Sequence, residues 1–103
     1  MTHRVLKTPQ ASDDLLEIAS FIALDNVDAA ERFFDAAEAA FARLAALPSL
    51  GKTALFASTL TQDTRVWRVE GFERYLIFYR PVESGIVVDR VLHTARDFPT
   101  IFQ

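Results

Sequence analysis

The end of the chain carries side chains whose types could do chemistry. Residues 90–99 read RVLHTARDFP and bring Arg90, His93, Arg96 and Asp97 close together in the sequence. Acid–base catalysis without a metal needs a base, an acid and cations that stabilise developing negative charge. Histidine and arginine can fill these roles. The cluster therefore predicts either a catalytic centre or a set of ionic contacts that hold the tail in place.

In the catalytic interpretation, His93 is the candidate acid–base residue, with Arg90 on the same strand. His93 is the one histidine expected inside the folded body, because His3 lies close to the N-terminus. Two histidines without any cysteine make no zinc site, so we expect neither a metal nor a cofactor.

In the structural interpretation, which we favour, His93 is half-buried near a strand end. Arg96 and Asp97 are consecutive, so within a strand they would face opposite ways and find different partners. Asp97 could then bind backbone N–H groups of the tail, or pair with a strand arginine such as Arg90.

Length and composition describe one domain over residues 1–103. Half of the residues are hydrophobic and there is no cysteine, which excludes disulfides and fits a reducing compartment. The first residues, MTHRVLKTPQ, lack the apolar stretch of a secretion signal, and no apolar run approaches the roughly 18 residues that span a bilayer. We therefore expect a cytoplasmic protein without a membrane segment.

The charges are unevenly distributed along the chain. Residues 1–46 carry four Lys/Arg against eight Asp/Glu, whereas residues 64–103 carry six arginines against five Asp/Glu, and the net charge is −3. An acidic balance argues against a chain that coats nucleic acid by itself. Arginine suits paired contacts with carboxylate or phosphate, so the second half is where we expect ionic recognition or salt bridges.

The elements that would position these residues follow a β-α-α-β-β-β order. A short strand is expected at 3–7, and Thr8-Pro9 predicts the start of a helix, since a hydroxyl cap followed by proline is typical there. A capping box at Asp28–Glu31 predicts the start of a second helix. Residues 52–63 lack clear periodicity and are expected to form a loop, with room for one short strand. Three β-rich runs follow at 65–69, 74–80 and 86–94. The fold class is α+β, with a helical hairpin packed on one face of a small, mainly antiparallel sheet.

The strand at 74–80 has apolar residues on both of its faces. Tyr75, Ile77 and Tyr79 alternate with Leu76 and Phe78, although a solvated face should be polar. One helical hairpin covers one face only. The second face therefore predicts a protein partner across an open apolar patch, or else cover from the tail residues Phe98, Ile101 and Phe102.

Taken together, these segments resemble a known family. The TPQASDDLLEIASFIALDN helix, the LPSLGK turn, the RYLIFYR strand and the VLHTARDFP ending, in that order, are similar to the ParE branch of the RelE/ParE toxins, over about residues 4–99. These proteins are the toxins of type II toxin–antitoxin pairs.

The resemblance implies an antitoxin whose C-terminal segment wraps the helical hairpin and the sheet. It also implies that operator DNA is bound only through the antitoxin, within a hetero-oligomer. On this basis the expected antitoxin contacts are Phe34, Phe41, Tyr75, Ile77 and Tyr79.

The family divides between ribosome-dependent mRNA endonucleases and inhibitors of DNA gyrase. RNA cleavage needs a base for the 2′-OH proton, an acid for the leaving 5′-oxygen and cations, and for a nuclease member the resemblance implies His93 with Arg74 and Arg90 in these roles. The nuclease members carry a tyrosine soon after the residue that matches His93, and a lysine-rich patch. Here Thr94 follows His93, no tyrosine follows Tyr79, and Lys52 is the only lysine beyond residue 7.

We therefore interpret the chain as an inhibitor of gyrase that acts by binding rather than as an enzyme. Its expected target contacts are Arg65, Trp67, Arg68 and Arg74, since tryptophan and arginine are enriched at binding hot spots. The alternatives are the mRNA endonuclease and a degenerate toxin that keeps only antitoxin binding.

Overall fold

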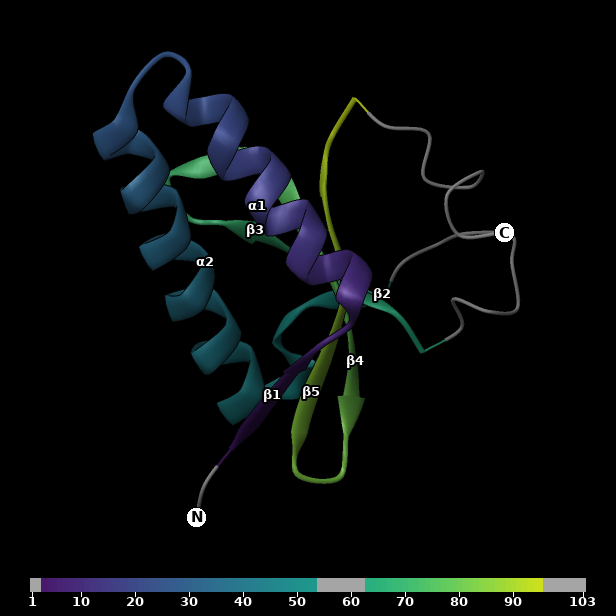
Figure 1. Ribbon diagram of the computed structural model, residues 1–103. Coiled ribbons are helices and arrows are strands. Elements are labelled where there is room, and N and C mark those ends of the chain that lie inside the picture. The colour runs from purple at the N-terminus through teal and green to yellow at the C-terminus, as the bar shows by residue number, and fades with distance from the viewer. Residues whose placement is uncertain (1–2, 54–62, 96–103) are drawn as a thin grey trace.

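Two helices lie on one side of a five-stranded sheet in the computed structural model, which describes residues 3–53 and 63–95 (Figure 1). The elements in chain order are β1 (Arg4–Lys7), α1 (Pro9–Ala23), α2 (Val27–Ala46), the 3-10 helix η1 (Pro48–Leu50), β2 (Lys52–Thr53), β3 (Arg65–Val69), β4 (Phe72–Val82) and β5 (Gly85–His93). The predicted α+β class and the helical hairpin on one face of the sheet are confirmed. The short β2 lies within the segment that was expected to be mostly loop.

The two helices begin at side-chain caps. The Thr8 hydroxyl accepts a hydrogen bond from the Ala11 N–H at 3.0 Å, as the Thr-Pro pair predicted. For the second helix the prediction was wrong: Asn26, not Asp28, is the cap, and its side-chain oxygen accepts from the Ala29 N–H at 3.0 Å. The asparagine lies in extended backbone just before the helix, so it reaches an N–H of the first turn that has no intrahelical partner.

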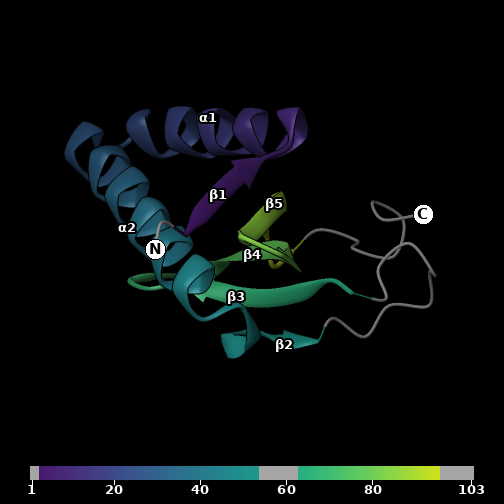
Figure 2. The same ribbon diagram turned by 90° about the horizontal axis from the view of Figure 1, so that it is seen from below.

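The strand order in the sheet is β1-β5-β4-β3-β2, with β1 parallel to β5 and the other pairs antiparallel (Figure 2). The helical hairpin lies between β1 and the other strands in the chain, and β1 forms the edge of the sheet next to β5. The β4–β5 register shifts between Phe78 and Tyr79: Phe78 lies opposite Arg90 and Tyr79 opposite Val88. Asp89 is therefore the extra residue of a bulge, which re-aims the side chains around it.

The core fills the space between the helices and the sheet. Its aromatic centre is Phe33, which meets the rings of Phe72 and Tyr75 edge-on, each at 5.4 Å between centroids. Such edge-to-face pairs are favourable beyond the apolar area that they bury. The other buried members of this cluster come from both helices and from β3, β4 and β5: Ala11, Leu15, Ala37, Ala40, Phe41, Leu44, Ala45, Val69, Ile77, Tyr79, Ile86, Val88 and Val91.

The second face of the sheet is closed at Phe78 and Leu92, whereas Leu76 on the same face is half-buried. Phe78 and Leu92 lie outside the helix-side core cluster, yet they are only 1% and 2% exposed. At these two positions the face has no apolar surface left for a partner. The tail considered as the alternative cover lies outside the described residues.

Tyr79 joins the sheet to the turn after α2. Its hydroxyl donates to the Pro48 carbonyl at 2.8 Å and accepts from the Gly51 N–H at 2.8 Å. A Cβ at position 51 would lie 2.5 Å from that hydroxyl, so only glycine fits this approach. Burial raises the pKa of Tyr79 above its ordinary value, and the Gly51 N–H and the charge of Arg65 oppose that shift. The turn is thereby fixed against β4 at Tyr79, which lies opposite the first residue of β3.

Candidate functional site

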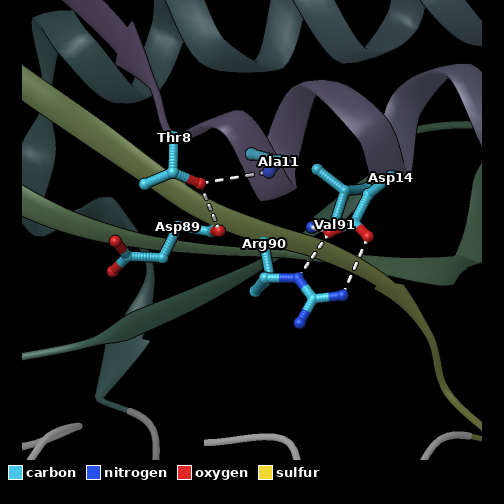
Figure 3. Close-up of polar contacts among 6 residues, drawn as sticks. All are labelled: Thr8, Ala11, Asp14, Asp89, Arg90 and Val91. Atoms are coloured by element: carbon cyan, nitrogen blue, oxygen red, sulfur yellow. Dashed lines mark hydrogen bonds and ion pairs between the residues drawn. The ribbon is translucent and has the colours of Figure 1, made fainter.

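The guanidinium of Arg90 on β5 is held by Asp14 of α1 (Figure 3). Nε donates to one carboxylate oxygen at 2.7 Å and Nη2 to the other at 2.9 Å. The backbone N–H of Val91 adds a third bond to Asp14 at 3.0 Å. Asp14 is only 8% exposed, so α1 is fixed to β5 by a nearly buried carboxylate whose bonds are all charge-assisted.

A second pair extends these contacts along the bulge. Arg80 donates through Nε and Nη2 to Asp89 at 2.8 and 3.0 Å, and the Asp89 carbonyl accepts from the Thr8 hydroxyl at 2.8 Å. The hydrogen-bonded carboxylates raise the pKa of Arg80 and of Arg90 above the ordinary arginine value, because each favours the charged form of its partner. We call the four residues Asp14, Arg90, Arg80 and Asp89 the ionic clasp. Their charges are neutralised within the fold.

The hydrogen bond and the ring contact of His93 go to residues other than Arg74 and Arg90, the other two nuclease candidates. Its Nδ1 accepts a hydrogen bond from the Ala95 N–H at 3.0 Å, and its ring meets that of Tyr75 edge-on at 5.2 Å. Tyr75, not Arg74, is the β4 residue opposite His93. Arg90 is held in the ionic clasp, and among the described residues no hydrogen bond joins an arginine to the imidazole. Arg96 and Asp97 lie outside the described residues, and the partner of Arg90 is Asp14, which sequence spacing did not indicate.

The predicted antitoxin contacts divide by burial. Phe41, Ile77 and Tyr79 are completely buried, so these three side chains present no surface to a partner in this fold. Phe34 and Tyr75 are half-buried at the margin of the core. Sequence periodicity thus identified core positions at Phe41, Ile77 and Tyr79, whereas Phe34 and Tyr75 keep part of their surface exposed.

An exposed apolar surface does exist on the helical hairpin. Leu16 and Phe21 of α1 are exposed, as are Leu24 and Val27 at the turn into α2, with Leu24 87% exposed. We call these four residues the hairpin patch. Phe21 also lines a hollow of about 270 Å³ between α1 and the end of β5. The other lining residues are Asp14, Glu17, Ile18, Tyr75, Val91, Leu92 and His93. The signal available in the sequence was the apolar residues of the first helix that lie off its buried stripe.

The predicted target contacts fall into two groups. Trp67 and Arg68 line a groove of about 610 Å³ along β3, together with Arg43, Lys52, Val66, Glu70 and Leu76. We call this the β3 groove. Arg65 and Arg74 do not line it. Arg65 donates to the carbonyls of Gly51 and Ser49 at 2.7 and 3.4 Å, and Arg74 is exposed on β4.

Comparisons with known proteins identify one family. The family model described as the ParE toxin of the type II toxin–antitoxin system, parDE, matches residues 5–98. No curated protein matches the sequence. Within the described part of the chain, no helix is both long enough and apolar enough to cross a membrane.

Proposed function

This chain belongs to the ParE family of type II toxins, and from that membership we propose that it inhibits DNA gyrase by protein–protein binding. A cognate antitoxin neutralises it in the cytoplasm by forming a hetero-oligomer with it. The observation that carries the proposal is the family match over residues 5–98.

The arrangement around His93 supports inhibition by binding over RNA cleavage. General acid–base catalysis needs its groups within hydrogen-bond reach of one reacting centre. Arg90 is neutralised by Asp14, and the His93 Nδ1 is taken by the Ala95 N–H, which leaves a single imidazole nitrogen for proton transfer. A protein that poisons gyrase needs no such constellation, since a binding surface is enough.

The hairpin patch supports an antitoxin that covers α1. Leu16, Phe21 and Leu24 are large apolar side chains exposed on one helix and its end, and such side chains exposed on one element usually mark a partner site. An antitoxin segment that buries them would stabilise the complex through the hydrophobic effect. Phe34 and Tyr75, which are half-buried nearby in the core margin, are proposed as secondary contacts.

The proposed target is tested by inducing the chain without an antitoxin and pulse labelling DNA and protein synthesis side by side. We expect DNA synthesis to fall first while translation continues. Purified gyrase incubated with the chain should then accumulate cleaved DNA. Translation that stops before DNA synthesis would instead identify the mRNA endonuclease, and a chain that inhibits neither process would be a degenerate toxin.

The antitoxin surface is tested by the double variant Phe21→Ser/Leu24→Ser, with Leu47→Ser as the matched control. Leu47 is also an exposed leucine, but it follows α2 rather than α1. Losing two large apolar contacts should weaken antitoxin binding by roughly 10- to 100-fold, because two side chains that are each about half covered together lose about 1.5–3 kcal/mol. Isothermal titration with the purified antitoxin measures this. Equal affinities of the double variant and the control would place the antitoxin elsewhere.

A further inference from the structure

The outer edge of β3 is only partly covered by its neighbour. The two residues of β2 pair with Arg65 and Val66 alone, and among the described residues no strand pairs with Trp67, Arg68 and Val69 on that side. Figure 2 shows β3 continuing past the end of β2 toward α2. An uncovered strand edge presents backbone N–H and C=O groups that another extended chain can pair with.

The β3 groove lies along this uncovered edge and has walls from both faces of the sheet. Trp67 lies opposite Ile77 on the helix side, while Val66 and Leu76 belong to the other face. The groove thus follows the strand edge, and we call its apolar lining residues, Val66, Trp67 and Leu76, its floor. This shape suits an extended segment that adds to the sheet and places alternate side chains on the two faces.

The rim of the groove is positively charged in a chain whose net charge is −3. It carries Arg43, Lys52 and Arg68 against a single acid, Glu70. Lys52 has no ion pair among the described residues, and Arg68 donates only to the Glu73 carbonyl, at 2.7 Å. Unlike the ionic clasp, these cations have no carboxylate partner within the described fold, so an acidic partner can pair with them.

From the uncovered edge, the apolar floor and the cationic rim, we propose that the β3 groove receives an extended acidic segment of the toxin's target protein as an added strand. This inference rests on the proposed function, in which the chain acts by binding a protein. The segment pairs with the backbone of Trp67–Val69, and its carboxylates meet Arg43, Lys52 and Arg68.

The charges distinguish the target from the antitoxin as the occupant. The hairpin patch lies beside acidic residues of α1 and its end, such as Glu17, Asp25 and Asp28, whereas the groove is cationic. A basic apolar segment complements the first surface and an acidic extended segment the second, so the two surfaces select different partners.

The occupant is a protein rather than a nucleic acid for two reasons. The guanidinium of Arg43 already lies over the Trp67 ring, 5.9 Å from its centroid, so that ring face is not free for base stacking. Nucleic acid also leaves the main-chain groups of an uncovered edge without partners, whereas a peptide strand satisfies them.

The first test uses the double variant Lys52→Glu/Arg68→Glu in cells that lack the antitoxin. Its matched control is Arg4→Glu/Arg32→Glu, which reverses two exposed arginines outside the groove. We expect the groove variant to lose growth inhibition and the control to keep it. A groove variant as toxic as the wild type overturns the proposal.

Antitoxin binding and stability separate this loss from misfolding. The groove variant should still co-purify with the antitoxin and unfold at the same temperature as the wild type. If it folds normally but no longer binds the antitoxin, the antitoxin occupies the groove and the proposal is wrong. If it does not fold, the milder variant Lys52→Gln/Arg68→Gln replaces it, and the same criteria apply to its toxicity.

Purified gyrase provides the direct binding measurement. The groove variant should bind it roughly 30-fold or more weakly, as expected for hot-spot contacts. In the wild-type complex the edge-facing amides of Trp67–Val69 should gain protection from hydrogen exchange. Unchanged exchange at these amides in a formed complex overturns strand addition. Loss of affinity for a single-stranded oligonucleotide, with gyrase binding intact, would show that the groove holds nucleic acid instead.

The two proposals fail separately. If the wild type binds no gyrase, the target assignment is wrong, yet the toxicity of the groove variant against its control still tests the groove, because growth inhibition reports any target. If gyrase binds the wild type and the groove variant equally, the function stands and the groove inference falls.

Discussion

The arginines of the ionic clasp and those of β3 lie in the same sheet but have opposite surroundings. Arg80 and Arg90 each donate two hydrogen bonds to an aspartate, at 2.7–3.0 Å. Arg65 and Arg68 donate to backbone carbonyls instead, and neither has a carboxylate within ion-pair distance among the described residues.

This difference teaches that the type of residue does not decide between structure and recognition. An arginine that faces an aspartate is neutralised and fixes the fold. One that bonds only to carbonyls is oriented but keeps its positive charge for a partner. The ionic clasp therefore holds α1 on β5, while the cations of the β3 groove keep their charge for the partner that we propose.

The largest expected effect comes from opening the ionic clasp. Asp14→Ala should lower the free energy of unfolding by roughly 2–4 kcal/mol, since it leaves the Arg90 guanidinium and the Val91 N–H without their acceptor. Urea denaturation measures the change. The control is Asp13→Ala, an exposed neighbour in the same helix, which should stay within about 0.5 kcal/mol of the wild type. Equal stability of the two variants would contradict a structural role for the clasp.

A smaller loss is expected where Tyr79 holds the turn beside β3. Tyr79→Phe removes the acceptor of the buried Gly51 N–H and the donor to Pro48, which should cost about 1–3 kcal/mol in urea denaturation.

The same variant should also change the alkaline pH dependence. The pKa of Tyr79 is raised in the folded state above 10.0, so the unfolded chain releases this proton first. Wild-type stability should therefore fall as the pH rises through 10, and Tyr79→Phe should lack that part of the fall. Parallel unfolding curves of both proteins between neutral and alkaline pH measure it. The same alkaline slope in both would exclude Tyr79 as its source.

From the comparison of the arginines we expect that removing an arginine side chain of β3 leaves the free energy of unfolding almost unchanged. Arg68→Ala should change the free energy of unfolding by no more than about 0.5 kcal/mol, because the side chain is exposed and its one bond goes to a carbonyl near the hairpin turn. Arg90→Ala, measured in the same urea series, should be clearly destabilised, since it leaves Asp14 nearly buried without its cation. Similar losses in both variants would remove the distinction between the two regions.

The smallest effect is expected at His93. His93→Gln should leave growth inhibition unchanged in cells without the antitoxin, since the proposed mechanism uses no proton transfer. The amide keeps a polar side chain of similar reach at a position where Nδ1 accepts only from Ala95. A folded variant that no longer inhibits growth would favour the nuclease interpretation.

The sequence was most informative where local rules act alone. Thr8 and Pro9 define the start of α1 because a cap needs only the next turn of backbone. The strand at 65–69 was placed with its observed bounds, since apolar alternation and turn residues are local signals. The same signals identified Phe41 and Ile77 as apolar positions. They could not show that both side chains are completely buried rather than exposed to a partner.

The chain by itself determined the α+β order, the helical hairpin and the family to which the toxin belongs, because these follow from short-range patterns and their succession. Only the tertiary structure decided that Arg90 pairs with Asp14 and that Arg68 pairs with no carboxylate in the described fold. Arg90 and Asp14 are 76 positions apart in the sequence, and they meet because α1 packs on β5. Which arginine is neutralised depends on the carboxylate that packing brings opposite it, and no local pattern encodes that.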